Sequence, residues 1–349
     1  MKGAGETAGA GDGTVEAGVA QALSALGLAG PGEAIGLVPL PGGVSSDIWH
    51  ASIGTGTAAR SVCVKRARPR LRVAALWEAP VERNHYEAEY MRLAGDVAPG
   101  LTPRLLGEDE ARGLLAMEYL DPSAWRVWKE ELRDGRVDLS AARAVADGVG
   151  RLHAGTADRS DVADRFPTDA FFHALRLDPY LAECARRHAD IAPRLEALVA
   201  TTAATRRVLV HGDVSPKNVL VSAQGVRLLD AECAWFGEPA FDVAFCLNHL
   251  LLKSVWKPRH AGGYRAAFAA FLEAYGARVT WEPPEALRER VAALLPGLLL
   301  ARVDGKSPVE YLTDEGDRAL VRRLARRFLE TPVADPAPIA DAVRAEVAP

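Results

Sequence analysis

A ten-residue polar segment, HGDVSPKNVL at 211–220, constrains the fold of this chain more than any other feature of the sequence. Its first eight residues, 211–218, lie between two short runs of valine and leucine, Val208–Val210 and Val219–Val221, so we expect a tight loop between two strands. A further β-run at Val226–Leu229 follows, and Asp230 stands directly after it. The loop and its flanking runs therefore predict a small β-insert that carries polar side chains at its turns.

The rest of the chain changes character near Leu120-Asp121-Pro122. Before this point β-runs separated by glycine turns predominate, such as Asp47–Ile53 and Ser61–Lys65. After it, long Ala/Leu/Arg segments with helical periodicity predominate, such as Phe171–Ala189. With 349 residues, two lobes are also the prior from length. We expect a β-rich lobe at 17–120, a mainly helical lobe at 121–330, a flexible tail at 1–16 and a second, partly ordered tail at 331–349.

Composition excludes several classes of function. The formal net charge of −4 gives no broad basic field, so we expect no nucleic-acid partner. The longest apolar stretch, Val291–Ala301, is too short to cross a bilayer, and the first residues have no apolar run typical of a signal peptide. The four cysteines form no CxxC pair or zinc spacing. We expect a cytoplasmic protein, monomer or homodimer, without a membrane partner.

The polar residues of the insert have the types that phosphoryl transfer requires. A loose, metaphosphate-like transition state is stabilised by positioning and by cations. Magnesium takes hard oxygen ligands, which the amide of Asn218 and the carboxylate of Asp230 supply. A second carboxylate must orient the incoming hydroxyl and accept its proton, and Asp213 on the same loop is placed for this. We therefore expect Asp213 to be the catalytic base.

The β-rich lobe offers the phosphate-binding partner. Lys65 lies on a strand after a glycine turn and is expected to reach the α- and β-phosphates of a nucleotide. A carboxylate must hold this lysine, and Glu87 on the following helix is the candidate. Glu82 and Glu89 remain alternatives because the sequence does not fix the register of the helix.

These motifs resemble the aminoglycoside phosphotransferase and choline kinase superfamily over residues 35–320. HGDxxxxNxL followed by an aspartate after the next hairpin is a specific pattern of that family. The resemblance implies an α+β, protein-kinase-like bilobal fold, with a β-rich N-lobe and a mainly helical C-lobe whose small β-insert carries the catalytic loop. It implies ATP (or GTP) and Mg²⁺ as cofactors.

The resemblance also assigns residues outside the loop. The segment PGGVSS at 41–46 is similar to the family's phosphate-covering loop, which implicates Gly42, Gly43, Ser45 and Ser46. The segment MEYL at 117–120 is similar to the hinge that pairs with the purine, which implicates Glu118 and Tyr119. Asp242 matches a buried aspartate that braces the catalytic loop.

Several further residues are assigned less uniquely, and most of them allow two interpretations. Lys217 is either a cation near the transferring phosphate or a solvated loop lysine. Glu232 is either a second magnesium ligand, as in choline kinase-like members, or one half of a salt bridge. His211 is expected to be structural, because its ring can bond the backbone and hold the loop. In this fold the C-terminal helices face the acceptor, so Arg302, Asp304 and Glu310 are either substrate contacts or part of a capped turn between helices.

Two departures from protein kinases point to a small-molecule acceptor. Asp242 follows Asp230 by twelve residues, which leaves no room for a long activation segment. About 57 residues separate His153 from His211, which indicates an inserted helical segment. The function expected is transfer of a γ-phosphoryl group to a hydroxyl of a small molecule. The alternatives are a non-catalytic nucleotide-binding module and a metal-dependent hydrolase that uses His211, Asp213 and another histidine such as His249 or His260.

Overall fold

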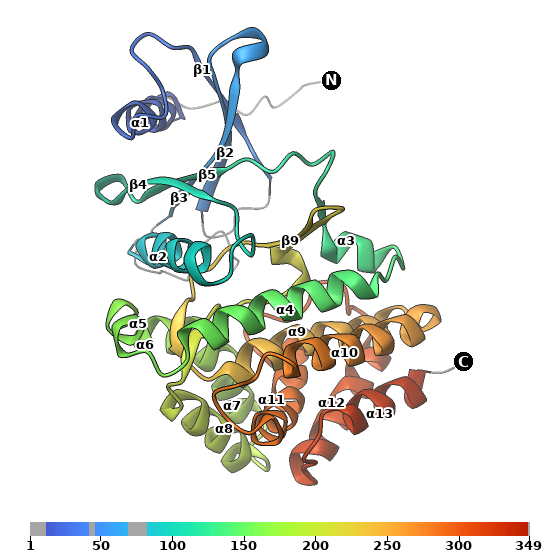
Figure 1. The fold of residues 1–349 in the computed structure, drawn as a ribbon. Coiled ribbons are helices and arrows are strands. Elements are labelled where there is room, and N and C mark those ends of the chain that lie inside the picture. Colours follow the sequence, from blue (N-terminus) through green and yellow to red (C-terminus); the bar gives the residue numbers. More distant parts are fainter. Residues whose placement is uncertain (1–11, 42–45, 69–81, 348–349) are drawn as a thin grey trace, which may run out of the picture. The chain divides into compact units, whose positions relative to one another are not determined.

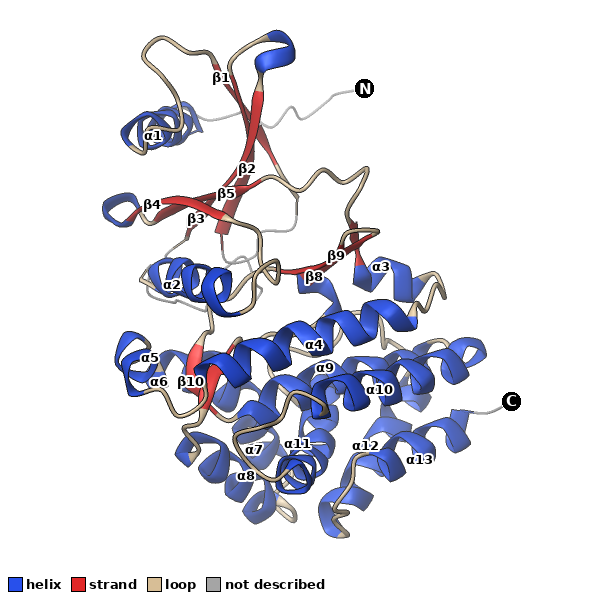
Figure 2. Cartoon of the chain, viewed as in Figure 1, coloured by secondary structure: helices blue, strands red, loops and turns tan. Residues whose placement is uncertain are grey.

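The computed structural model describes residues 12–41, 46–68 and 82–347 (Figure 1). The chain divides into two compact units, residues 1–88 with 103–120 and residues 89–102 with 121–349. The first unit contains a five-stranded antiparallel sheet, and the second is mainly helical with short strands (Figure 2). The expected α+β class is confirmed.

The sheet of the first unit has the strand order β1-β2-β3-β5-β4, and every neighbouring pair is antiparallel. Its strands are β1 (Ile35–Pro39), β2 (Ser46–Ile53), β3 (Arg60–Ala67), β4 (Leu105–Asp109) and β5 (Leu114–Glu118). Two helices accompany the sheet: α1 (Asp12–Ala25), and α2 (Arg83–Val97), of which the first unit contains the start, to Ala88.

Alternation along β3 places its side chains on two faces of the sheet. Val62 and Val64 are buried in one cluster with Val19 and Leu23 of α1, so that helix covers one face. Successive residues of a strand point to opposite faces. Lys65 therefore points to the face of the sheet opposite the α1 cluster.

The second unit consists of packed helices with two small sheets, ordered β6-β8-β9 and β10-β7. Its strands are β6 (Arg126–Val127), β7 (Val208–Val210), β8 (Val219–Ser222), β9 (Gly225–Leu228) and β10 (Trp235–Gly237). Its helices are α3 (Trp128–Arg133), α4 (Leu139–Thr156), α5 (Ser160–Arg165), α6 (Asp169–Phe172), the π-helix η3 (His173–Ala182), α7 (Glu183–Arg187), α8 (Ala192–Ala204), α9 (Pro239–Trp256), α10 (Ala261–Gly276), α11 (Pro284–Asp304), α12 (Glu315–Glu330) and α13 (Ala337–Val347).

Helix α9 is the central helix of this unit and is buried from Pro239 to Val255. Its start is fixed by the sequence: Glu238 accepts a hydrogen bond from the backbone N–H of Ala240, and Pro239 occupies the first turn, where it loses no helical hydrogen bond. A helix that is apolar on all sides is stable only in an interior. The few polar residues of α9 are consequently held inside the fold.

Three segments differ from expectation. The single helix expected at Phe171–Ala189 is divided into α6, η3 and α7, because Pro179 lacks an N–H and lies inside a π-helical stretch. The tail expected at 331–349 contains α13, which buries Ile339, Ala340 and Val343. The tail expected at 1–16 overlaps α1, which begins at Asp12.

Candidate functional site

The loop after β7 is held by one buried carboxylate. Asp242 of α9 is fully buried, and its two oxygens accept the backbone N–H groups of His211 at 2.7 Å and Gly212 at 2.8 Å. His153 of α4 contacts the same carboxylate through Nε2 at 3.3 Å. An aspartate in the first turn of a helix is also favoured by the helix dipole. Asp242 thus fixes the backbone immediately before Asp213.

The ring of His211 links this loop to the strand that precedes Asp230. Its Nδ1 lies 3.1 Å from the backbone N–H of Asp213 and accepts that bond, so Nε2 carries the proton and donates to the carbonyl of Leu229 at 3.2 Å. Burial lowers the pKa of His211, and the nearby charges of Asp242 and Asp213 only partly oppose it. A neutral ring suits these two bonds, which agrees with a structural role.

Asp213 is a buried carboxylate with two cations on one of its oxygens. Its Oδ2 lies 3.0 Å from Arg176 and 3.1 Å from Nζ of Lys217. Burial alone would raise the pKa of Asp213, but the charges of Lys217 and Arg176 outweigh it and hold the pKa well below its ordinary value. Asp213 is therefore ionised at neutral pH, even though only 4% of the residue is exposed and burial disfavours a charge.

Arg176 is the residue of this cluster that the sequence did not indicate. It lies on η3, donates through Nε to the carbonyl of Gly212 and stacks over the ring of Phe245 at 5.9 Å. π-helical turns are frequent at functional sites, and Pro179 is the local signal that could have indicated one here. The contact itself depends on tertiary packing of the inserted helical segment.

The glycine at 212 is required by a close approach of two chain segments. Gly212 has a φ of +79°, and a Cβ there would lie 2.7 Å from the carbonyl oxygen of Cys233. Left-handed backbone costs other residues roughly 1–2 kcal/mol. The clash adds to this, so the loop tolerates no side chain at 212.

We expect Gly212→Ala to lower the free energy of unfolding by about 2–5 kcal/mol, the sum of backbone strain and overpacking. Gly100→Ala is the matched control, because Gly100 has a φ of +80° but only ordinary contacts around a built Cβ. It should lose only the strain part, about 1–2 kcal/mol. Urea unfolding of both variants measures the difference, and equal losses would refute the contact with Cys233.

The three expected magnesium ligands lie on the β-insert and just beyond it. Asn218 is buried and donates from Nδ2 to the carbonyl of Asp213 at 3.1 Å, which leaves Oδ1 as its second polar atom. Asp230 follows β9 and has a φ of +68°, an uncommon conformation outside glycine. Its charge, with that of Asp213, raises the pKa of Lys217. Glu232 is near enough for its charge to act on Arg176.

In the first unit, the expected lysine–glutamate pair is present. Nζ of Lys65 lies 2.6 Å from Oε2 of Glu87, and both residues are buried. Glu82 precedes α2 and is exposed, whereas Glu89 pairs with Arg165 and Arg92. The register of α2 therefore selects Glu87 among the three glutamates.

The other nucleotide-binding predictions are only partly within the described residues. Gly42, Gly43 and Ser45 lie outside them. Ser46 begins β2 and is buried, and its hydroxyl has no hydrogen-bond partner among the described residues. Glu118 ends β5 beside β3, and its backbone N–H bonds to Arg104. Tyr119 stacks on His50 of β2 with ring centres 4.0 Å apart.

The three expected substrate contacts on the C-terminal helices separate into different environments. Arg302 donates to the hydroxyl of Tyr180 at 3.1 Å and to Ser307. Asp304, two positions later on α11 and thus on the other side of the helix, is bound by Arg322 at 2.8 Å and by His188 at 3.0 Å. Glu310 pairs with Lys129.

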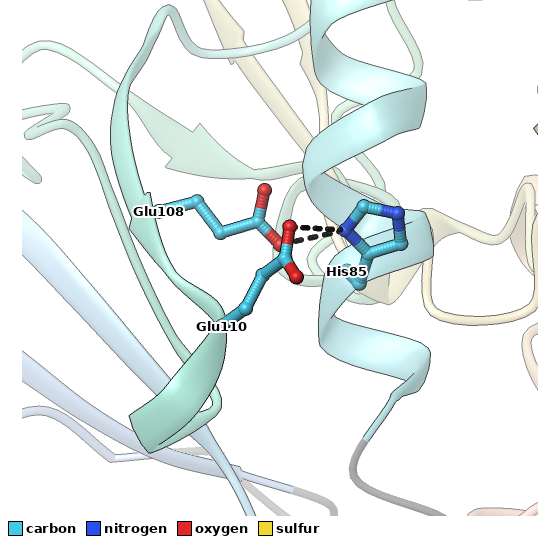
Figure 3. Close-up of side chains that lie close together, drawn as sticks. All are labelled: His85, Glu108 and Glu110. Carbon is cyan, nitrogen blue, oxygen red and sulfur yellow. Dashed lines mark hydrogen bonds and ion pairs between the residues drawn. The ribbon is translucent and has the colours of Figure 1, made fainter.

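A second polar cluster in the first unit consists of residues that the sequence analysis did not single out. His85 of α2 lies 3.0 Å from Glu108 and 3.4 Å from Glu110 (Figure 3). This is the only group of three or more histidine, cysteine or acidic side chains within the described residues whose ligand atoms lie within 4.8 Å of one another. His211, His249 and His260 belong to no such group within the described residues.

The family model for phosphotransferase enzymes matches residues 36–294, and the chain therefore belongs to the phosphotransferase enzyme family. This confirms the resemblance seen in the sequence. None of the helices in the described ranges is long and apolar enough to cross a membrane.

Two relatives resemble this chain in sequence, and a solved structure resembles it in fold. The chain is 27% identical over 247 residues to methylthioribose kinase of Yersinia enterocolitica, covering 63% of this chain and 61% of the relative. It is 28% identical over 239 residues to methylthioribose kinase of Cronobacter sakazakii, covering 60% and 58%. It thus spans about three fifths of the length of these relatives. Amicoumacin kinase in complex with AMP-PNP, Ca²⁺ and Ami has a similar fold, with a TM-score of 0.52 at 13% identity, covering 86% of this chain and 90% of that one.

Proposed function

We propose that this protein transfers the γ-phosphoryl group of ATP or GTP to a hydroxyl of a small molecule, with Mg²⁺ as cofactor. The observation that carries the proposal is the ionised carboxylate of Asp213, held between Lys217 and Arg176 on a loop braced by Asp242. The family membership supports the reaction class.

Asp213 would orient the acceptor hydroxyl and take its proton. The acceptor oxygen bonds to the γ-phosphorus while the bond from that phosphorus to the β–γ bridging oxygen breaks, and ADP or GDP leaves. A carboxylate with a lowered pKa is a weak base, so the proton moves late, when the forming ester bond has made the hydroxyl acidic. In a loose transition state little proton transfer is needed early. Orientation is then the main contribution of Asp213.

The cations beside Asp213 would act on the phosphoryl group. Lys217 is half-exposed, with 54% of its side chain accessible, whereas Arg176 is tied to the loop carbonyl of Gly212. Lys217 can therefore turn toward a transferring phosphate, while Arg176 keeps the carboxylate in place. Preorganised cations stabilise the charge that develops in the transition state.

The donor set after the loop fits magnesium. Asn218 and Asp230 offer an amide oxygen and a carboxylate, which are the hard ligands this ion takes, and Glu232 offers a further carboxylate nearby. When bound, the ion neutralises charge on the phosphate oxygens. The uncommon backbone at Asp230 is consistent with a conformation kept for binding.

Lys65 would bind the phosphates of the nucleotide, with Glu87 fixing its ammonium. We expect Lys65→Met to raise the KM for nucleotide about ten- to a hundredfold, because a hydrogen bond to a charged group contributes about 1.5–3 kcal/mol. Initial rates at varied nucleotide concentration measure this. Lys306→Met, which removes a half-exposed surface lysine paired with Asp178, is the control and should leave KM unchanged. An unchanged KM in Lys65→Met would remove Lys65 from the nucleotide site.

The name of the relatives makes methylthioribose the first acceptor to assay. Release of ADP with Mg²⁺ and ATP, with and without each acceptor, tests the proposal. Acceptor-dependent ADP release supports it. Nucleotide binding without transfer to any acceptor would favour the non-catalytic module instead.

A further inference from the structure

Three buried polar atoms within the second unit have no hydrogen-bond partner among the described residues and lie in one neighbourhood: Nζ of Lys253, Nε of Arg302 and the hydroxyl of Tyr311. Nζ of Lys253 lies 4.8 Å from the ring centre of Tyr311 and 5.3 Å from that of Trp256. The charge of Arg302 acts on the hydroxyl of Tyr311. We call these three residues, Lys253, Arg302 and Tyr311, the donor cluster.

The burial of Lys253 is unusual for a lysine. Only 1% of the residue is exposed, and two aromatic faces are its observed partners. Buried ammonium groups are costly unless they are paired, and cation–π contacts return only part of that cost. A lysine with three donor hydrogens, buried and without an acceptor in the described part of the chain, indicates that a ligand supplies the acceptor.

The charges around Lys253 favour an anion. Burial and the positive charges of Lys129, Arg133 and Lys257 together lower the pKa of Lys253 to about 8, against an opposing contribution from Glu310. Glu310 is itself paired with Lys129. The neighbourhood is therefore cationic, and an anion would restore the ordinary pKa of the lysine.

The donor cluster lies on the same elements as the proposed acceptor-orienting residues. Phe245, His249 and Lys253 follow one another along one face of α9 at a spacing of four residues. Phe245 carries Arg176, which holds Asp213, and the charges of Asp213, Arg302 and Lys253 all act on His249. Eight residues of helix separate Phe245 from Lys253, a rise of about 12 Å.

We propose that Lys253, Arg302 and Tyr311 bind an anionic group, a carboxylate or a phosphate. Arg302 is held by Tyr180 and Ser307 at its terminal nitrogen, so its Nε is preset as a donor. The three donors match an acceptor-only oxyanion. In terms of the proposed function, on which this part rests, the anionic group belongs to the acceptor and lies apart from its reacting hydroxyl, which Asp213 would orient.

Binding of inorganic phosphate to the full chain tests the site without requiring turnover. The titration is made by calorimetry in a Lys65→Met background, so that the proposed nucleotide contact does not contribute. We expect Lys253→Met to weaken phosphate binding at least about tenfold, and Lys253→Arg to retain it. Lys257→Met is the matched control, because Lys257 also lies over Trp256, at 4.3 Å, but is not buried; it should change binding less than about twofold.

The fold is checked in the same variants. Since Lys253→Met removes a buried charge, it should fold and melt at or above the temperature of the parent protein. No phosphate binding by the parent, or equal binding by Lys253→Met, would overturn the site.

The source of the anion is tested by competition. If the acceptor carries it, phosphate inhibits competitively against the acceptor, and Lys253→Met raises the acceptor KM with an unchanged kcat. Phosphate binding that depends on Lys253 but does not compete with the acceptor identifies a free anion as the ligand. Phosphate binding that depends on Lys253 in a protein with no transferase activity leaves the site standing and removes the proposed function. Efficient transfer to an uncharged acceptor by a protein that binds no phosphate removes the anion site and leaves the proposed function standing.

Discussion

Replacing Asp213 by asparagine is expected to lower kcat about 10²- to 10⁴-fold, the usual contribution of a positioned proton acceptor. The amide keeps the size of the side chain but can neither accept the hydroxyl proton nor balance Lys217 and Arg176, which lie 3.1 and 3.0 Å away. Loss of the negative charge removes repulsion toward phosphates, so nucleotide affinity should be kept or increased. Steady-state rates and nucleotide titration measure both quantities.

The control for this variant is Asp178→Asn. Asp178 lies on η3, as Arg176 does, but pairs with Lys306 and Arg186 at the surface. Surface ion pairs contribute about 0–1 kcal/mol, so its kcat should be unchanged. A kcat for Asp213→Asn within about threefold of the parent would exclude Asp213 as the proton acceptor.

The second large effect is expected at Asp242. Asp242→Ala removes the acceptor for two backbone N–H groups and one contact of His153 inside the fold. Buried donors without a partner cost about 1–3 kcal/mol each, so the free energy of unfolding should fall by about 3–5 kcal/mol. Activity should fall with it, because the same bonds position Asp213.

Asp242→Asn separates these effects. The amide retains one acceptor oxygen, so about half of the loss is expected. Urea unfolding monitored by tryptophan fluorescence measures both variants. A loss below about 1 kcal/mol in Asp242→Ala would show that the loop is held by other contacts.

The sequence predicted the polar loop of the second unit more fully than the lysine–glutamate pair of the first unit. The polar loop between Val208–Val210 and Val219–Val221 could be placed because both β-runs are short, apolar and bounded by turns. The partner of Lys65 could be limited to three glutamates but not chosen, because residues two apart on a helix, such as Glu87 and Glu89, face different sides. The fold of the backbone decides which side meets Lys65.

Arg176 and the donor cluster could not be predicted by local pattern. Arg176 precedes Asp213 by 37 residues, and its contact depends on how the inserted segment packs around Pro179. Lys253 stands in a mainly apolar helix that is buried along its length, a pattern that predicts burial but not the partner of a buried charge. Helix α13 could have been predicted, since Ile339, Val343 and Val347 recur at intervals of four. The prolines around this segment instead led to the prediction of a tail.

The most direct test of the proposed phosphoryl transfer is to follow all phosphorus species by ³¹P NMR. The protein is mixed with Mg²⁺, ATP and one acceptor at a time, beginning with methylthioribose and continuing with uncharged, cationic and anionic alcohols. We expect a new phosphomonoester resonance to appear in step with ADP for at least one acceptor, and to be lost in Asp213→Asn. ATP that remains unchanged with every acceptor, or that yields only ADP and inorganic phosphate, would contradict transfer to a small-molecule hydroxyl.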